Sequence, residues 1–279
     1  MDGSHSTFVS PSPANSALAR TLRQPAPLPK MGRLGRRAAF ASPLILLIVW
    51  SALSYSGLFP KEIVVPPDGI WRAFISQWSS GELPKNLLGS LQRLAVGYGV
   101  GAGLGIVLGV LMGASKQAEA YLMPAFQTLR QLPTIALIPA FIMIFGVGET
   151  VKIVLVAKAT ALPVTLGAFQ GVRGVPSRWF EVARLFRIPA PVVATKVILP
   201  AILPSLFQGL RIALSHAWVV LVGAELLIAD NGIGQMMEWG RQTFRLDIVL
   251  VGVVLTGLIG FLLDKGFRLL ERGLKGRGA

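Results

Sequence analysis

Long apolar runs separated by short polar segments dominate the sequence. Each run is long enough to cross the roughly 30 Å hydrocarbon core of a bilayer as an α-helix. The six runs cover about residues 38–58, 87–113, 121–145, 150–172, 197–229 and 246–263. This pattern predicts an all-α, polytopic membrane protein with about six transmembrane helices.

The segments outside these runs are polar, amphiphilic or basic. Residues 1–37 are rich in Ser, Pro and Ala and then basic, which predicts a disordered tail. A signal peptide is the rival interpretation, but the first apolar run starts too far into the chain and is too long. Residues 273–279 form a second basic tail, leaving 38–272 as the membrane domain. Trp71 and Trp78 place the amphiphilic stretch 59–86 at the outer interface.

Glycines and prolines within the apolar runs indicate where helices pack closely and where they are interrupted. In the second run, glycines recur every four residues, which gives a smooth stripe for close helix packing. The stripe consists of Gly97, Gly101, Gly105, Gly109 and Gly113, with Gly99 and Gly103 beside it. Packing within one subunit is the default interpretation, and a seam between subunits is the alternative. Prolines interrupt the third run at Pro124, Pro133 and Pro139.

Composition and charge support a membrane protein with a defined orientation. Hydrophobic residues make up 53% of the chain and charged residues 14%, with a mean hydropathy of +0.63; soluble domains carry roughly 25% charged residues. Of the 27 lysines and arginines, 17 lie in the N-terminal tail, at Lys116, in the loop 173–196 and after residue 263. By the positive-inside rule this bias places both termini in the cytoplasm. It also accounts for the net charge of +14 without nucleic acid.

Several functional classes lack the residues they need. The chain has no cysteine and only two histidines, which excludes disulfides, Cys-based metal sites and a histidine metal cluster. No lysine is followed by serine or threonine, so the phosphate-binding loop of P-loop ATPases is absent. Any ATPase that drives this protein must therefore be a different chain.

A charged, proline-punctuated segment, residues 173–204, lies between the fourth and fifth runs. Pro176 and Ser177 are a plausible stop and N-cap, and Pro189 prevents the helix from continuing. The helix between them is amphipathic. Its apolar stripe is Trp179, Val182, Ala183 and Phe186, and its polar face is Arg178, Glu181 and Arg184. An ordinary cytoplasmic loop whose arginines only enforce topology is the simpler alternative.

One motif in this segment favours a more specific interpretation. Glu181-Val182-Ala183 is followed later by Val197-Ile198-Leu199-Pro200. This pattern resembles the EAA loop of permease subunits in bacterial ABC importers, in which Glu-Ala-Ala, a glycine and Ile-x-Leu-Pro occur in order. Arg187 stands where the glycine is expected, and Pro189 offers another way to make the bend.

The resemblance implies a MetI-like permease architecture in the bacterial cytoplasmic inner membrane, with a cytoplasmic coupling helix. It also implies a homodimer, a separate ABC ATPase that binds the ATP, and a periplasmic or extracellular substrate-binding protein. This chain would carry no cofactor. The residues implied to contact the ATPase are Glu181, Val182, Ala183, Arg184, Leu185, Arg187, Leu199 and Pro200.

The coupling helix should divide its side chains between two neighbours. We expect Trp179, Val182 and Phe186 to anchor it to the cytoplasmic ends of the spans. Glu181, Arg184 and Leu185 would then face a groove on the ATPase. An exposed Glu181–Arg184 pair would stabilise the helix by less than about 1 kcal/mol.

Ionisable and polar residues within the runs are candidates for a translocation path. Those of interest are Lys158, His216, Trp218 and Glu225. Hydrogen bonding between helices is the alternative role for each. Arg93 and Arg130 are expected to snorkel to the membrane surfaces, and Lys152 to lie at the interface.

Looser similarities point to the alkanesulfonate, taurine and nitrate branch of the permeases. They are the Ile135–Pro139 segment, the Phe145–Gly148 turn and Trp218 with Ala224-Glu225. We expect an aliphatic sulfonate or a similar small organic anion as substrate, with taurine, nitrate or a heterocyclic vitamin precursor as alternatives. A secondary transporter is a more distant alternative, since only Glu225 is available as a coupling-ion carboxylate.

Overall fold

The computed structural model describes residues 33–58, 60, 63–228 and 230–275, and every regular element in that part of the chain is helical. The tail predictions for residues 1–32 and 276–279 lie outside it. The described residues up to 53 and those from 54 onward form two separate compact units. Helix α2 (Arg33–Tyr55) begins before the predicted residue 38. It therefore includes Arg33, Arg36 and Arg37, which the sequence pattern had placed in the tail.

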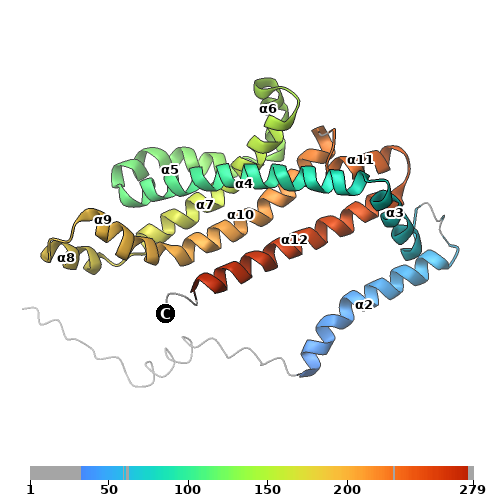
Figure 1. The fold of residues 1–279 in the computed structure, drawn as a ribbon, viewed down its shortest axis with the longest axis horizontal. Helices are drawn as coiled ribbons and strands as arrows, with labels where there is room; N and C mark the ends of the chain where they lie inside the picture. The colour runs from blue at the N-terminus through green and yellow to red at the C-terminus, as the bar shows by residue number, and fades with distance from the viewer. Residues whose placement is uncertain (1–32, 59, 61–62, 229, 276–279) are drawn as a thin grey trace, which may run out of the picture. The chain divides into compact units, whose positions relative to one another are not determined.

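The second unit is a bundle of long helices joined by short ones (Figure 1). The elements before the coupling segment are α3 (Pro67–Ser79), α4 (Glu82–Ala114), α5 (Lys116–Gln131), η1 (Ile135–Leu137), α6 (Ile138–Phe145) and α7 (Glu149–Arg173). Those after it begin with α8 (Ser177–Leu185) and α9 (Ala190–Val193), then a π-helical turn η2 (Ala194–Ile198), α10 (Leu199–Ile228), α11 (Ile233–Gln242) and α12 (Leu246–Lys275).

The described helices agree with the all-α, membrane-spanning fold but not with six simple spans. Four are long and apolar enough to cross a bilayer, namely α4, α7, α10 and α12, and the pair α5 and α6 makes a fifth if it counts as one span. In α2, the apolar helix Leu44–Tyr55 is shorter than these four. Helix α12 continues to Lys275, well past the predicted end at residue 263.

The predicted third span is two helices that meet at an angle of 91°. The break contains Pro133, whereas Pro124 stays inside α5 and Pro139 lies in the first turn of α6. A proline is tolerated in the first turn of a helix because its missing N–H has no intrahelical partner there. The expectation that all three prolines interrupt the helix was therefore wrong for two of them.

The glycine stripe of α4 packs against α7, within the subunit. A Cβ atom at Gly105 would lie 2.8 Å from the carbonyl oxygen of Ala161, and one at Gly97 would lie 2.9 Å from that of Ile153. Only glycine permits this close approach of two helix backbones. Gly103 faces open space, so the stripe alone makes the contact. The prediction of close packing inside one subunit is confirmed.

Helices α7 and α10 cross at a second pair of glycines. A Cβ atom at Gly167 would lie 3.0 Å from the Cα atom of Gly209, and one at Gly209 would lie 2.9 Å from the Pro163 carbonyl oxygen. On another face of α10, the indole N–H of Trp218 donates to the carbonyl oxygen of Thr256 on α12 at 2.9 Å. Helix α10 is thus held between α7 and α12.

Helix α11 packs against the bundle. Residues 236–245 lie between the fifth and sixth apolar runs, a position that predicts a short exposed segment. Instead, Ile233, Gly234, Met236, Met237 and Gly240 are buried. Met237 belongs to the same core cluster as Trp218 and Val222 of α10. The expectation failed because the charged residues of α11, Glu238 and Arg241, occupy only one side of the helix.

Candidate functional site

Helix α8 and the short α9 lie at the end of the bundle where α7 stops and α10 begins (Figure 1). Pro176 is the residue before α8, in an extended conformation, and its carbonyl accepts from the N–H of Trp179 at 3.0 Å. Ser177 is the first helical residue, and the N-terminus of α8 has no side-chain cap. The expectation that Ser177 caps this helix was wrong, because Pro176, with ψ of 132°, occupies the N-cap position and has no side-chain acceptor to offer.

The C-terminus of α8 turns on Arg187. The N–H of Ile188 donates to the Ala183 carbonyl at 2.9 Å, and the N–H of Arg187 donates to the Arg184 carbonyl at 3.0 Å. These two bonds define a Schellman motif, in which the residue after the C-cap adopts the left-handed conformation that glycine favours. Arg187 occupies that position with φ of 51°. The turn expected from the family glycine is therefore present, although an arginine makes it.

One side of α8 faces the start of α10. Trp179, Val182 and Ala183 line a hollow of about 460 Å³, whose other walls are Ile188, Lys196, Val197, Pro200 and Ala201. Ala183 is buried, while Trp179 and Val182 keep 41% and 51% of their surface exposed. The hollow is therefore only partly filled by the apolar side chains of α8.

Two details of the predicted faces were wrong. Phe186 is 72% exposed and does not line the hollow, because it lies in the turn after the helix rather than on its inner face. Among the ion pairs of the described residues, Glu181 and Arg184 do not form one. Glu181, Arg184, Leu185 and Arg187 are all exposed, and Leu199 in the first turn of α10 is 48% exposed.

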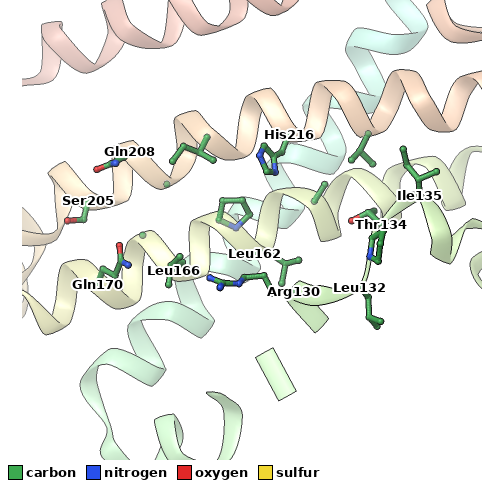
Figure 2. Close-up of a pocket in the computed structure, with 17 residues that line it drawn as sticks. Arg130, Leu132, Thr134, Ile135, Leu162, Leu166, Gln170, Ser205, Gln208 and His216 are labelled. Atoms are coloured by element: carbon green, nitrogen blue, oxygen red, sulfur yellow. The ribbon is translucent and has the colours of Figure 1, made fainter. Parts of the chain in front are cut away.

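A cavity of about 520 Å³ lies among the end of α5, the second half of α7 and the middle of α10 (Figure 2). Helix α7 contributes a stripe of residues with helical spacing, from Ala159 to Gln170, and α10 contributes another, from Ser205 to Val220. The polar residues of the lining are Arg130, Thr134, Gln170, Ser205, Gln208 and His216. Arg130, an exposed residue, lines this open cavity.

The four residues predicted for a translocation path occupy different places. His216 lines the cavity. Lys158 is not among the lining residues, and its ammonium donates to the Leu132 carbonyl at 3.0 Å and to the Thr134 hydroxyl at 3.1 Å. Trp218 and Glu225 are buried elsewhere on α10, in contacts with neighbouring helices. Only His216 of the four thus lines the cavity itself.

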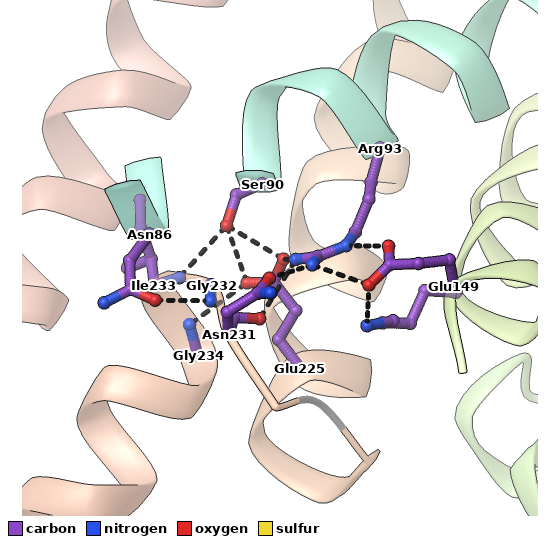
Figure 3. A network of polar contacts seen from close by, with 10 residues as sticks. Asn86, Ser90, Arg93, Glu149, Glu225, Asn231, Gly232, Ile233 and Gly234 are labelled. Carbon is purple, nitrogen blue, oxygen red and sulfur yellow. Dashed lines mark hydrogen bonds and ion pairs between the residues drawn. The ribbon is translucent and has the colours of Figure 1, made fainter. Parts of the chain in front are cut away.

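Glu225 belongs to a buried polar network that joins α4, α7, α10 and the turn before α11 (Figure 3). Its carboxylate accepts from the Ser90 hydroxyl and from Arg93 Nη1, both at 2.8 Å, and from the Gly234 N–H at 3.1 Å. Asn86 and Ser90 bind the backbone N–H groups of Gly232 and Ile233 at 2.7 and 3.0 Å. The side chains of α4 thus fix the course of the chain between α10 and α11.

The same network corrects two expectations. Arg93 does not snorkel: its side chain is 5% exposed and also binds Glu149, with Nε 2.5 Å from the carboxylate. Lys152 is not interfacial but buried, and it donates to Glu149 at 2.7 Å. Two cations and two carboxylates balance one another, which removes the reason for either cation to reach water. The presence of opposite charges in three predicted spans was the only sequence signal for this network.

Comparison with known proteins identifies the family. The sequence profile of the family described as "Binding-protein-dependent transport system inner membrane component" matches residues 101–276. The chain belongs to this family of permeases. A Bacillus subtilis permease named for aliphatic sulfonates transport, SsuC, is 38% identical over 88% of this chain and 89% of its own. The Escherichia coli taurine transport permease TauC is 32% identical over 82% of this chain and 86% of its own.

Solved structures agree with this assignment at the level of the fold. The permease is similar to an inward-facing form of the MetNI methionine ABC transporter, with a TM-score of 0.54 and 21% identity over 66% of this chain and 94% of that chain. It is also similar to an amino acid ABC transporter crystallised with histidines, with a TM-score of 0.56 and 16% identity over 71% and 96% of the two chains. The MetI-like architecture implied by the sequence is thus confirmed.

Proposed function

We propose that this permease forms the translocation path of an ATP-driven importer for aliphatic sulfonates or a similar small organic anion. In this proposal, α8 is the coupling helix that contacts a separate ATPase subunit. Glu181, Val182, Ala183, Arg184, Leu185, Arg187, Leu199 and Pro200 form or support the contact surface. Both termini lie in the cytoplasm, a second copy completes the membrane unit, and a binding protein delivers the substrate from outside.

The observation that carries this proposal is the exposure of α8. Of its described side chains, only that of Ala183 is buried. Leu185 is 78% exposed, next to the exposed charges of Glu181 and Arg184. A short helix that presents apolar and charged side chains beyond the bundle is suited to fit a groove on another protein.

Helix α8 is also connected stiffly enough to transmit a displacement. Its C-terminal turn is fixed by the Arg187 and Ile188 backbone bonds, and Ala183 faces the start of α10. A partner can shift the balance between two arrangements of the bundle only if it binds one of them better. Movement of α8 would reach the cavity through α10, since Ser205 and Gln208 lie about one and two helical turns beyond Pro200.

The substrate class is inferred from the relatives. Two proteins named for aliphatic sulfonates transport, from Bacillus subtilis and Escherichia coli, are each 38% identical to this chain. The taurine permease and a Synechococcus elongatus permease named for bicarbonate transport are each 32% identical. These names favour a small anion, and an aliphatic sulfonate first.

A bulky substitution at Ala183 tests the coupling role. Ala183→Phe would push α8 away from α10, so we expect loss of ATP-driven sulfonate uptake with normal permease abundance in the membrane. Uptake of a labelled alkanesulfonate would be measured in cells that co-express the ATPase and the binding protein. Ser76→Phe, at an exposed position of α3, is the matched control. Uptake by Ala183→Phe at the wild-type rate would refute the coupling assignment.

A further inference from the structure

The charged side chain that lines the cavity among α5, α7 and α10 is positive, and no negative one balances it among the described lining residues. The described residues that line it include one guanidinium, from Arg130, and no aspartate or glutamate. Arg130 is also absent from the ion pairs that the described residues form, whereas Arg93, Arg173, Arg211 and Arg268 each have a carboxylate partner. A guanidinium that has no carboxylate partner and lines an open cavity of a membrane protein favours an anionic ligand.

Lys158 adds a second positive charge near the cavity, although it is not one of the lining residues. Lys158 on α7 binds the Leu132 carbonyl and the Thr134 hydroxyl, at the break that directly follows α5. These bonds hold the loop that contains Pro133 and therefore the helix end that carries Arg130. The ammonium of Lys158 forms no ion pair within the described residues, so its charge adds to that of Arg130.

The other residues that line the cavity are polar in one part and apolar in another. Figure 2 shows the Arg130 side chain extending along α7 toward Leu166, with Gln170, Ser205 and Gln208 farther along the cavity. Amide and hydroxyl groups can donate to the oxygens of an anion. The remaining wall is apolar and includes Leu162, Pro163, Leu166, Ile212 and Val220. The cavity therefore offers donors for a charged head and an apolar surface for a short hydrocarbon tail.

We infer that this cavity is an anion-binding site in the permease itself, in which Arg130 binds the sulfonate headgroup of an aliphatic sulfonate and the leucines of α7 contact its tail. This inference rests on the proposed function for its substrate class. It goes further because it gives the permease a selective site of its own, beyond any selection by a binding protein. A substrate that also carries an ammonium group would find no carboxylate among the described lining residues.

Thiol labelling can test this site without any transport measurement. The chain has no cysteine, so Gln208→Cys introduces a single thiol into the cavity. The permease, assembled with its ATPase in membrane vesicles, would be treated with two methanethiosulfonate reagents of similar size. One carries a sulfonatoethyl group and the other a trimethylammonioethyl group. Ser76→Cys, at an exposed position of α3, gives the ratio of the two rates away from the cavity.

The expected result is a preference for the sulfonate reagent at position 208 that exceeds the ratio at position 76 by about tenfold. Adding Arg130→Gln to Gln208→Cys should abolish the preference, and adding Arg130→Lys should keep most of it. An alkanesulfonate should also slow the labelling of Gln208→Cys when Arg130 is intact. This measurement does not require any Arg130 variant to fold.

Two outcomes would overturn the inference: equal reagent ratios at positions 208 and 76, or labelling that an alkanesulfonate does not slow.

Uptake measurements separate this result from the proposed function. If the unaltered importer takes up alkanesulfonates and Arg130→Gln does so at the same rate, the headgroup site is wrong while the transport function stands. If the unaltered importer takes up no sulfonate although the sulfonate reagent is preferred at position 208, the transported substrate is a different anion. Arg72→Gln, an exposed arginine on α3, is the matched control for uptake.

Discussion

Arg93 and Glu225 are 132 positions apart in the sequence, and their side chains meet at 2.8 Å in the interior of the bundle. The Arg93 side chain is 5% exposed and that of Glu225 is fully buried. A buried ion pair of this kind is tolerated only when the remaining donors and acceptors are also satisfied. Ser90, Glu149 and the backbone of the turn before α11 provide those partners.

Removal of Arg93 should strongly destabilise the permease. Arg93→Ala leaves the carboxylate of Glu225 buried without a cation, and breaking a buried pair in this way costs about 3–5 kcal/mol. Thermal unfolding of the purified permease would measure the loss. Arg241→Ala, which breaks the surface pair with Glu238, is the matched control and should cost much less, because exposed ion pairs contribute little to stability. Equal losses for the two variants would contradict a structural role for the buried pair.

The glycine stripe of α4 allows a paired test on one helix. Gly105→Ala places a methyl group 2.8 Å from the Ala161 carbonyl oxygen, so α4 and α7 must separate. We expect a loss of about 1–3 kcal/mol in the free energy of unfolding. Gly103→Ala meets nothing within 4 Å and should be neutral, or stabilising by up to about 1 kcal/mol through helix propensity. A similar loss for both variants would show that backbone flexibility matters here, and not close packing.

Much of the fold could be predicted because it depends on local patterns. The apolar runs gave α4, α7 and α10 nearly to their ends, and the four-residue spacing from Gly97 to Gly113 predicted a close helix contact. The pattern could not say that α7 is the partner, because that depends on the rotation of both helices about their axes. For the same reason, Arg93 looked like a snorkelling arginine rather than a partner of Glu225.

The candidate site was harder to predict for other physical reasons. A proline in a helix can be accommodated or can break it, and the sequence does not show that Pro133 rather than Pro124 turns the chain by 91°. Arg130 became a candidate only once this break placed it beside α7. In α8, the helical spacing predicted an apolar stripe correctly, yet Phe186 belongs to the turn and is 72% exposed.

The exposed pair on α11 gives a prediction about pH. The Arg241 guanidinium and the Gln242 amide lower the pKa of Glu238 to about 2 from its ordinary value of 4.5. A carboxylate with a lowered pKa contributes stability above its unfolded pKa and loses it as the pH falls through the folded value. Glu238→Gln should therefore lower the unfolding temperature equally at pH 5 and pH 7. The difference from the unaltered protein should shrink below about pH 4.5. A difference that changes between pH 5 and pH 7 would contradict this assignment.

Substitutions at Arg187 can distinguish the effect of its left-handed backbone from the effect of its guanidinium. A left-handed backbone costs a non-glycine residue about 1–2 kcal/mol, and Arg187 has φ of 51°. Arg187→Gly should therefore stabilise the turn after α8 by about 1 kcal/mol. Arg187→Val should weaken it, because a β-branched side chain fits this conformation poorly. Local hydrogen exchange of the amides of residues 187 and 188 would measure both effects.

If only the turn matters for coupling, sulfonate uptake by Arg187→Gly should equal that of the unaltered importer. If the guanidinium itself contacts the ATPase, Arg187→Gly should lose uptake while its amides become better protected.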